Sequence, residues 1–193
     1  QVTVTGIVTS PRAGPHSAYY VQFGISGTKV VQVVDGLTDL MAGMEIEVTG
    51  TIDSLDGEFV LSNSVAALLS EDNPLPEPVK LTSTEQWSVD SDLAGSRITL
   101  ENVSLVDASE WPVSPLSDED SVIVVMVKGN LEKLSGPFAI YIAAGSELDG
   151  TIVPEGAFNI TGVLDISGEQ VKLIPFIISD KDVATANEEN LDI

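Results

Sequence analysis

Two short segments of the sequence gather carboxylate side chains, which are the oxygen ligands that calcium ions prefer in proteins. Asp53, Asp56 and Glu58 fall in one predicted hairpin loop, and Asp118 and Asp120 fall in a second loop. Neither segment has the ligand spacing of an EF-hand loop. These five carboxylates are candidate Ca²⁺ ligands, and no other cofactor is expected. A solvated turn is the alternative for both segments, because Asp-Gly is a favoured hairpin turn.

Catalytic chemistry has few candidate residues in this sequence. The chain contains one histidine, His16, and no cysteine. A Ser-His-Asp triad would have to use His16, yet no G-x-S-x-G motif accompanies it. A zinc site built from several histidines or cysteines is excluded within one chain. We therefore expect a chain without a catalytic cluster, although a longer parent protein could still be an enzyme.

Aromatic residues provide the other candidate binding groups. The run Ala18–Phe23 is a predicted strand in which Tyr20 and Gln22 lie on one face and Tyr19, Val21 and Phe23 on the other. One of these faces must belong to the core. We predict Tyr20 and Gln22 as an exposed ligand-binding pair. Phe59, on a later strand, and Trp111, in a long loop, are further candidates for stacking against a ligand. The alternative for Trp111 is that it covers the end of the barrel.

These residues are set among short strands that follow one another closely. The first 61 residues predict five strands, approximately at 2–8, 18–23, 29–34, 44–52 and 58–61, with a bend in the first strand at Gly6. The segment Asp35–Ala42 predicts one or two helical turns, and Ser83–Gln86 has the spacing of a capping box that opens a short helix. Five strands with a bent first strand favour an oligonucleotide/oligosaccharide-binding (OB) barrel over an immunoglobulin-like sandwich, which needs about seven.

The second half of the sequence repeats the first. Val48-Thr49-Gly50 recurs as Ile160-Thr161-Gly162, and Asp53 recurs as Asp165. Further strands are predicted at 97–106, 121–127 and 138–143, with a short helix at 144–148. We therefore predict an all-β protein of two tandem OB-like five-stranded β-barrels with short helical inserts. The predicted units are a first barrel at 1–70, a linker with a short helix at 71–92, a second barrel at 93–183 and an acidic tail at 184–193.

Charge and hydropathy limit the classes of partner. The 30 acidic and 8 basic residues give a formal net charge of −22. Such a chain repels phosphate backbones and anionic membranes, so nucleic acid is disfavoured as a partner. A hydrophobic content of 43% is enough for a folded core. No apolar run approaches the roughly 20 residues of a membrane-spanning helix, so we expect no membrane span in this chain.

Several segments resemble a group of bacterial extracellular proteins. Val4-Thr5-Gly6-Ile7-Val8, the strand Ala18–Phe23 and Val48-Thr49-Gly50 resemble the barrels of secreted bacterial nuclease-like proteins and of Bacteroidetes surface proteins of unknown function. The run Leu75–Thr82, followed by Leu93–Val103, resembles the passage between two such barrels. The resemblance implies tandem OB-like barrels and an extracellular or cell-surface location. A signal peptide removed before Gln1 is consistent with this expectation.

Together these observations predict a non-catalytic accessory or interaction module of a secreted or surface-exposed bacterial protein, with an unknown protein or glycan partner. Two alternatives stay open. In the first alternative, the pair of barrels is the nucleic-acid-binding part of an extracellular nuclease. In the second, it is a glycan-binding module. The even spread of acidic residues over both halves indicates an exterior adapted to saline surroundings rather than one binding patch.

Overall fold

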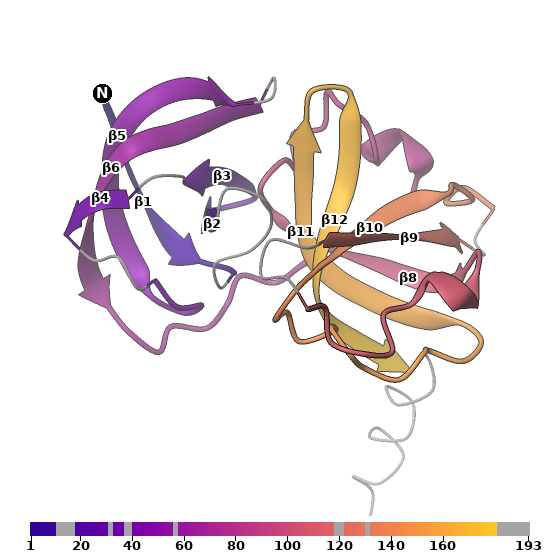
Figure 1. Cartoon of the computed structure of the whole chain (residues 1–193). Coiled ribbons are helices and arrows are strands. Elements are labelled where there is room, and N and C mark those ends of the chain that lie inside the picture. Colours follow the sequence, from indigo (N-terminus) through magenta and orange to yellow (C-terminus); the bar gives the residue numbers. More distant parts are fainter. Residues whose placement is uncertain are drawn as a thin grey trace, which may run out of the picture.

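Two β-barrels lie side by side in the protein (Figure 1). The computed structural model describes residues 1–10, 18–30, 33–36, 40–55, 58–117, 122–129 and 132–180. His16, Asp56, Asp118, Asp120 and the predicted acidic tail lie outside the described residues.

The first barrel is built from five strands and one short addition. The strands are β1 (Val2–Val8), β2 (Tyr19–Phe23), β3 (Ser26–Val30), β5 (Glu45–Leu55) and β6 (Glu58–Ser70). Their order is β3-β2-β1-β5-β6, and a parallel pairing of β3 with β6 closes the barrel. The short strand β4 (Val33–Gly36) pairs in parallel with β6.

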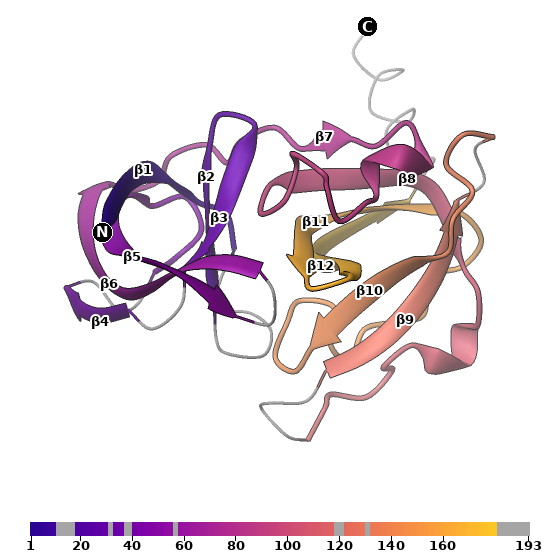
Figure 2. The same ribbon diagram turned by 90° about the horizontal axis from the view of Figure 1, so that it is seen from above.

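The second barrel repeats this arrangement. Its strands are β8 (Arg97–Leu105), β9 (Val122–Gly129), β10 (Phe138–Ala143), β11 (Phe158–Ser167) and β12 (Gln170–Asp180). A parallel pairing of β10 with β12 closes it, as β3 and β6 close the first barrel. The short strand β7 (Val79–Lys80) pairs in parallel with β8 (Figure 2). The predicted all-β fold of two tandem OB-like five-stranded barrels is confirmed.

The sequence repeat marks equivalent bulges in the two barrels. Gly50 on β5 and Gly162 on β11 both sit where the register with the following strand shifts by one residue. At Gly162 an added Cβ would collide with the backbone carbonyl of Ile174. At Gly50 it would lie 2.7 Å from the Ser64 hydroxyl oxygen. The bulge at Gly162 therefore needs glycine, and at Gly50 a Cβ would also crowd the Ser62 backbone oxygen at 3.1 Å, so glycine suits both copies of the recurring Val/Ile-Thr-Gly sequence.

The first strand bends where the sequence predicts. Residues Val2–Ile7 of β1 pair with β5, whereas Ile7 and Val8 pair with β2. At Gly6 an added Cβ would lie 2.5 Å from the backbone oxygen of Gln22. One strand therefore serves both sides of the barrel, because glycine lets it approach its neighbour closely.

The helices differ in part from prediction. The capping box at Ser83 and Gln86 is present and opens a one-turn 3-10 helix, η1 (Thr84–Gln86). A second, η2 (Ala108–Glu110), follows β8. The helix predicted at Asp35–Ala42 is wrong where the structure describes it, because Asp35 and Gly36 pair in β4 and 37–39 are outside the described residues. The helix predicted at 144–148 is also wrong, since 144–150 form turns rich in Gly, Ser and Asp.

Each barrel has its own apolar core. Side chains that alternate along the strands fill both interiors, as the period-two pattern predicts. The first core contains Val8, Tyr19, Val21, Val30, Leu40, Met44, Ile46, Val48, Leu61 and Ala66. The larger second core includes Ile98, Leu100, Trp111, Phe138, Ile140, Phe158 and Leu173. Among the described residues, no helix has the length and apolar character needed to cross a membrane.

Candidate functional site

Tyr20 and Gln22 point out of the first barrel, yet they are not exposed. Tyr19 and Val21 face the core, so the predicted division of the strand into two faces is correct. Tyr20 and Gln22 are each only 2% exposed. Tyr20 packs in a separate apolar cluster with Val163 and Ile174 of the second barrel. The predicted exposed ligand pair is therefore wrong, because the outward face of β2 and β3 is covered by β11 and β12 (Figures 1 and 2).

A carboxylate from the second barrel lies at the centre of this contact. Asp165 on β11 is 1% exposed and accepts a hydrogen bond of 2.7 Å from the Tyr20 hydroxyl. The Lys29 ammonium lies 3.2 Å from Asp165 Oδ1, and the Lys172 ammonium lies 2.9 Å from Oδ2. Tyr20 and Lys29 come from the first barrel, whereas Asp165 and Lys172 come from the second. We call these four residues the inter-barrel network.

The surroundings of Asp165 decide its charge. Burial alone raises the pKa of this carboxyl group, because removal from water penalises the charged form. The charges of Lys29 and Lys172, with hydrogen bonds from Lys172 and Tyr20, act in the opposite direction and prevail. The net result is a pKa below the ordinary value for aspartate. Asp165 is therefore ionised at neutral pH and pairs with Lys29 across the contact and with Lys172 of its own barrel.

Further polar and backbone contacts fix how the barrels meet. Gln22 Oε1 accepts a hydrogen bond of 3.0 Å from the backbone N–H of Arg97, and the Ser96 hydroxyl donates one of 2.6 Å to the backbone oxygen of Ile25. Gly27 and Gly95 approach so closely that a Cβ on either would collide with the other's backbone. This contact tolerates only glycine at Gly27, so the β2–β3 turn and the entry to β8 have one way to fit together.

Trp111 is a core residue and not an exposed platform. It directly follows η2, is 3% exposed and belongs to the core of the second barrel. Its indole N–H donates a hydrogen bond of 3.2 Å to the backbone oxygen of Thr151. A buried indole needs such a partner for its N–H, and the loop 144–157 supplies one. The predicted stacking role of Trp111 is thus wrong.

The candidate calcium ligands are only partly within the described structure. Asp53 is exposed at the end of β5, where Oδ1 accepts from the backbone N–H of Ser54 and Oδ2 from the hydroxyl of Ser62. Asp56, Asp118 and Asp120 lie outside the described residues, as does the Glu58 side chain. Within the described ranges, no group of three or more His, Asp or Glu side chains is placed to hold a metal ion. The calcium sites stay predictions.

Phe59 borders an open apolar groove at one end of the first barrel. The side chain is 79% exposed at the start of β6, and the groove has a volume of about 420 Å³. The walls come from β1, the β2–β3 hairpin and the β5–β6 hairpin. The lining residues are Val2, Val4, Phe23, Gly27, Thr28, Ile52, Phe59, Val60 and Leu61. We call this space the β1 groove. Phe59 stays a candidate binding residue, now with an apolar surface around it.

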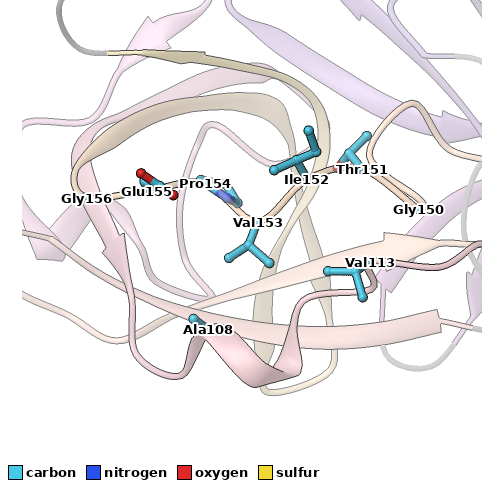
Figure 3. Close-up of a pocket in the computed structure, with 9 residues that line it drawn as sticks. All are labelled: Ala108, Val113, Gly150, Thr151, Ile152, Val153, Pro154, Glu155 and Gly156. Atoms are coloured by element: carbon cyan, nitrogen blue, oxygen red, sulfur yellow. The ribbon is translucent and has the colours of Figure 1, made fainter.

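The second barrel has an open hollow of about 570 Å³. Residues 150–156 form one wall, and Ala108 and Val113 form the other. The Val153 side chain points from the first wall into the space between the two (Figure 3). The Thr151 hydroxyl already donates to the backbone oxygen of Leu148, which leaves Glu155 as the ionisable group of the lining. This hollow therefore offers mainly apolar contact.

The two copies of the repeat differ at the positions that form the inter-barrel contact, and the likeness between the copies does not predict it. On the outward side of the β11–β12 hairpin, Val163 and Ile174 form a directly opposed pair. The equivalent pair on β5 and β6 is Thr51 and Ser62. Two apolar residues on an outward face beside Asp165 indicate a covered surface. That contrast between the copies is the sequence feature that could have located the contact.

Comparisons with known protein families, curated proteins and solved structures found no match to this chain. The fold and its internal repeat therefore define the class as a tandem pair of OB-like barrels. The likeness to secreted nuclease-like and surface proteins stays a prediction from the sequence.

Proposed function

We propose that this chain is a non-catalytic interaction module in which two OB-like barrels act as one rigid unit. The observation that supports this function best is the inter-barrel network. It occupies the outward face of β2 and β3, which is the face with which OB barrels commonly engage ligands. The first barrel therefore uses its usual binding face to hold the second barrel.

The surroundings of Asp165, whose pKa is lowered, support a structural role for this carboxyl group. Shifted pKa values mark catalytic groups and structural ion pairs alike, so the surroundings must decide. Asp165 has almost no contact with solvent and its two oxygens are shared among Lys29, Lys172, Tyr20 and Ser167. A substrate would have to separate the barrels to reach it.

A turnover panel tests the absence of catalysis. The 193-residue chain is assayed against phosphodiester, phosphomonoester, glycoside, ester and peptide substrates, with and without added Ca²⁺. The proposal predicts no turnover above the buffer blank. Hydrolysis that persists in the purified chain and disappears in His16→Ala or Asp56→Asn would overturn the proposal.

Nucleic-acid binding is the alternative with the clearest test. Two of the chain's eight basic residues, Lys29 and Lys172, form ion pairs with Asp165, and the formal net charge is −22. Fluorescence anisotropy with labelled single-stranded DNA at low salt, where phosphate contacts are strongest, should show no binding. Salt-sensitive binding would restore the alternative of a nuclease-associated module.

We further propose that the module works outside a bacterial cell, in saline surroundings. The net charge of −22 supports this setting, since salt screens repulsion among surface carboxylates. The melting temperature should rise as NaCl is increased to molar levels. A flat or falling trend would contradict the proposed setting.

A further inference from the structure

The end of the second barrel that corresponds to the β1 groove is closed by the chain itself. Residues 79–93 run along β8 and then across the barrel end (Figure 2). The backbone N–H of Leu81 donates a hydrogen bond of 3.0 Å to the backbone oxygen of Thr99, and the Leu81 side chain is buried in the core. Trp87 stacks edge-on against Phe138 at a centroid distance of 4.9 Å. Leu93 also packs on this core.

Strand pairing gives the equivalent positions in the two barrels. Val2 lies opposite Gly50 as Ile98 lies opposite Gly162, and the glycines are equivalent. The next residue along confirms the match, because the hydroxyls of Thr3 and Thr49 lie 2.7 Å apart. In the second barrel, the hydroxyls of Thr99 and Thr161 lie at the same distance of 2.7 Å.

Positions that are buried in the second barrel are open in the first. Ile98, Leu100 and Leu164 are fully buried. Their counterparts Val2 and Val4 are only half-buried, and Ile52, the counterpart of Leu164, is 56% exposed. Thr28 replaces the buried Phe138, as the parallel pairings β3–β6 and β10–β12 show. The β1 groove is thus the same barrel end without its cover.

The backbone edge beside the groove is open as well. Val2–Thr5 of β1 pair with β5 on one side, and β2 takes up only Ile7 and Val8 on the other. Within the described part of the chain, no strand pairs with the free side of Val2–Thr5. In the second barrel β7 occupies the equivalent side at Ile98 and Thr99. The groove also continues into the inter-barrel contact, because Gly27 lines it and touches Gly95.

We propose that the β1 groove binds an extended segment of a partner protein, which adds as a short strand parallel to β1 and inserts large apolar side chains. This inference rests on the proposed function as an interaction module and specifies its partner. The backbone oxygen of Thr3 takes the role of the Thr99 oxygen, and Ile52, Phe59 and Val4 receive an aliphatic and an aromatic anchor. Basic residues flank the anchors, because exposed Glu47 pairs with Thr5 of β1, exposed Asp53 follows Ile52 along β5, and the chain carries −22.

The probe for this site is a fluorescein-labelled synthetic peptide with the sequence of residues 77–89, carrying Glu77→Lys and Glu85→Lys. It keeps the anchors Leu81 and Trp87 and is tested by anisotropy against the full chain. A matched peptide has a methyl group on the Leu81 amide nitrogen, which removes the expected hydrogen bond to the Thr3 oxygen. We expect the methylated peptide to bind about tenfold more weakly.

Protein variants locate the binding. Phe59→Ser should weaken binding about tenfold, whereas Ile152→Ser, at another exposed apolar residue, should leave it unchanged. Both variants should melt at the wild-type temperature, since both side chains are largely exposed. In ¹⁵N-labelled protein, the amide shifts caused by the peptide should centre on Val2–Thr5.

Several results would overturn the inference. These are no binding at millimolar peptide, equal binding of both peptides, equal binding to Phe59→Ser, or shifts centred on Ile98 and Thr99 instead. A dimer of the unliganded chain that Phe59→Ser dissociates would assign the groove to a second copy. Turnover by the chain refutes the proposed function whatever the peptide does, whereas absent turnover together with absent peptide binding refutes this inference alone.

Discussion

Replacement of Asp165 by asparagine is the most informative perturbation of the inter-barrel contact. Asn keeps the size of the side chain and can still accept a hydrogen bond from the Tyr20 hydroxyl, which now lies 2.7 Å away. It removes the negative charge that Lys29 and Lys172 share at 3.2 and 2.9 Å. Both buried ammonium groups then lose the counter-charge that Asp165 supplies.

The expected loss of stability follows from removing the negative charge that pairs with Lys29 and Lys172. Removing one partner of a buried ion pair costs about 3–5 kcal/mol, much more than the median exposed pair. Asp165 is 1% exposed and both lysine side chains are 7% exposed, so the cost expected for a buried ion pair applies here. With an m-value of about 2 kcal/mol/M, the urea midpoint of Asp165→Asn should fall by about 1.5–2.5 M.

Urea unfolding followed by tryptophan fluorescence and by circular dichroism measures this change. Asp53→Asn is the matched control, because Asp53 occupies the equivalent position in the first barrel and is exposed. Its midpoint should change by less than about 0.5 M. If Asp165→Asn unfolds within about 0.5 M of the wild type, the network is not buried as described and the reasoning is refuted.

Three further outcomes follow from the same contacts. The lowered pKa of Asp165 contributes stability that is present above about pH 4 and is lost as the pH falls through the folded-state pKa. The melting temperature should therefore fall steeply over that pH range in the wild type, and this steep fall should be absent in Asp165→Asn. Gly27→Ala places a methyl group against the backbone of Gly95. It should increase proteolysis between the barrels while the circular dichroism spectrum stays that of two folded barrels, and unchanged proteolysis would contradict the close approach. Trp111→Phe loses the hydrogen bond to Thr151 and should cost about 1–2 kcal/mol in urea unfolding, and no loss would mean that the indole N–H is not buried there.

The barrels themselves are predictable from the sequence because local patterns determine them. Alternation along Ala18–Phe23 separated the faces correctly, and the glycines at Gly6, Gly50 and Gly162 marked a bend and two bulges that the structure contains. The helix at Asp35–Ala42 was not predictable in the same way. Polar, turn-forming residues are compatible with a helical turn, and the pairing of β4 with the distant β6 decides the outcome.

The contact between the barrels is the part that alternation within one copy could not predict. Alternation shows that Tyr20 points away from its own core, but it cannot distinguish water from a second domain as its neighbour. The stacking role of Trp111 was wrong and its alternative, a cover for the barrel, agrees with the burial of Trp111 in the second core, because long-range packing decides whether a loop residue is exposed. Both errors concern long-range packing. The sequence indicates the inter-barrel contact only when Val163 and Ile174 are compared with their polar counterparts in the first barrel.

The central claim is that the two barrels form one rigid unit through the covered face of β2 and β3. Spin labels at Glu47→Cys and Lys128→Cys, one exposed site on each barrel, test it by pulsed dipolar spectroscopy, and the chain has no cysteine of its own. A single narrow distance distribution is expected in the wild-type background, with clear broadening in Asp165→Asn. A broad distribution in the wild-type background would contradict the claim.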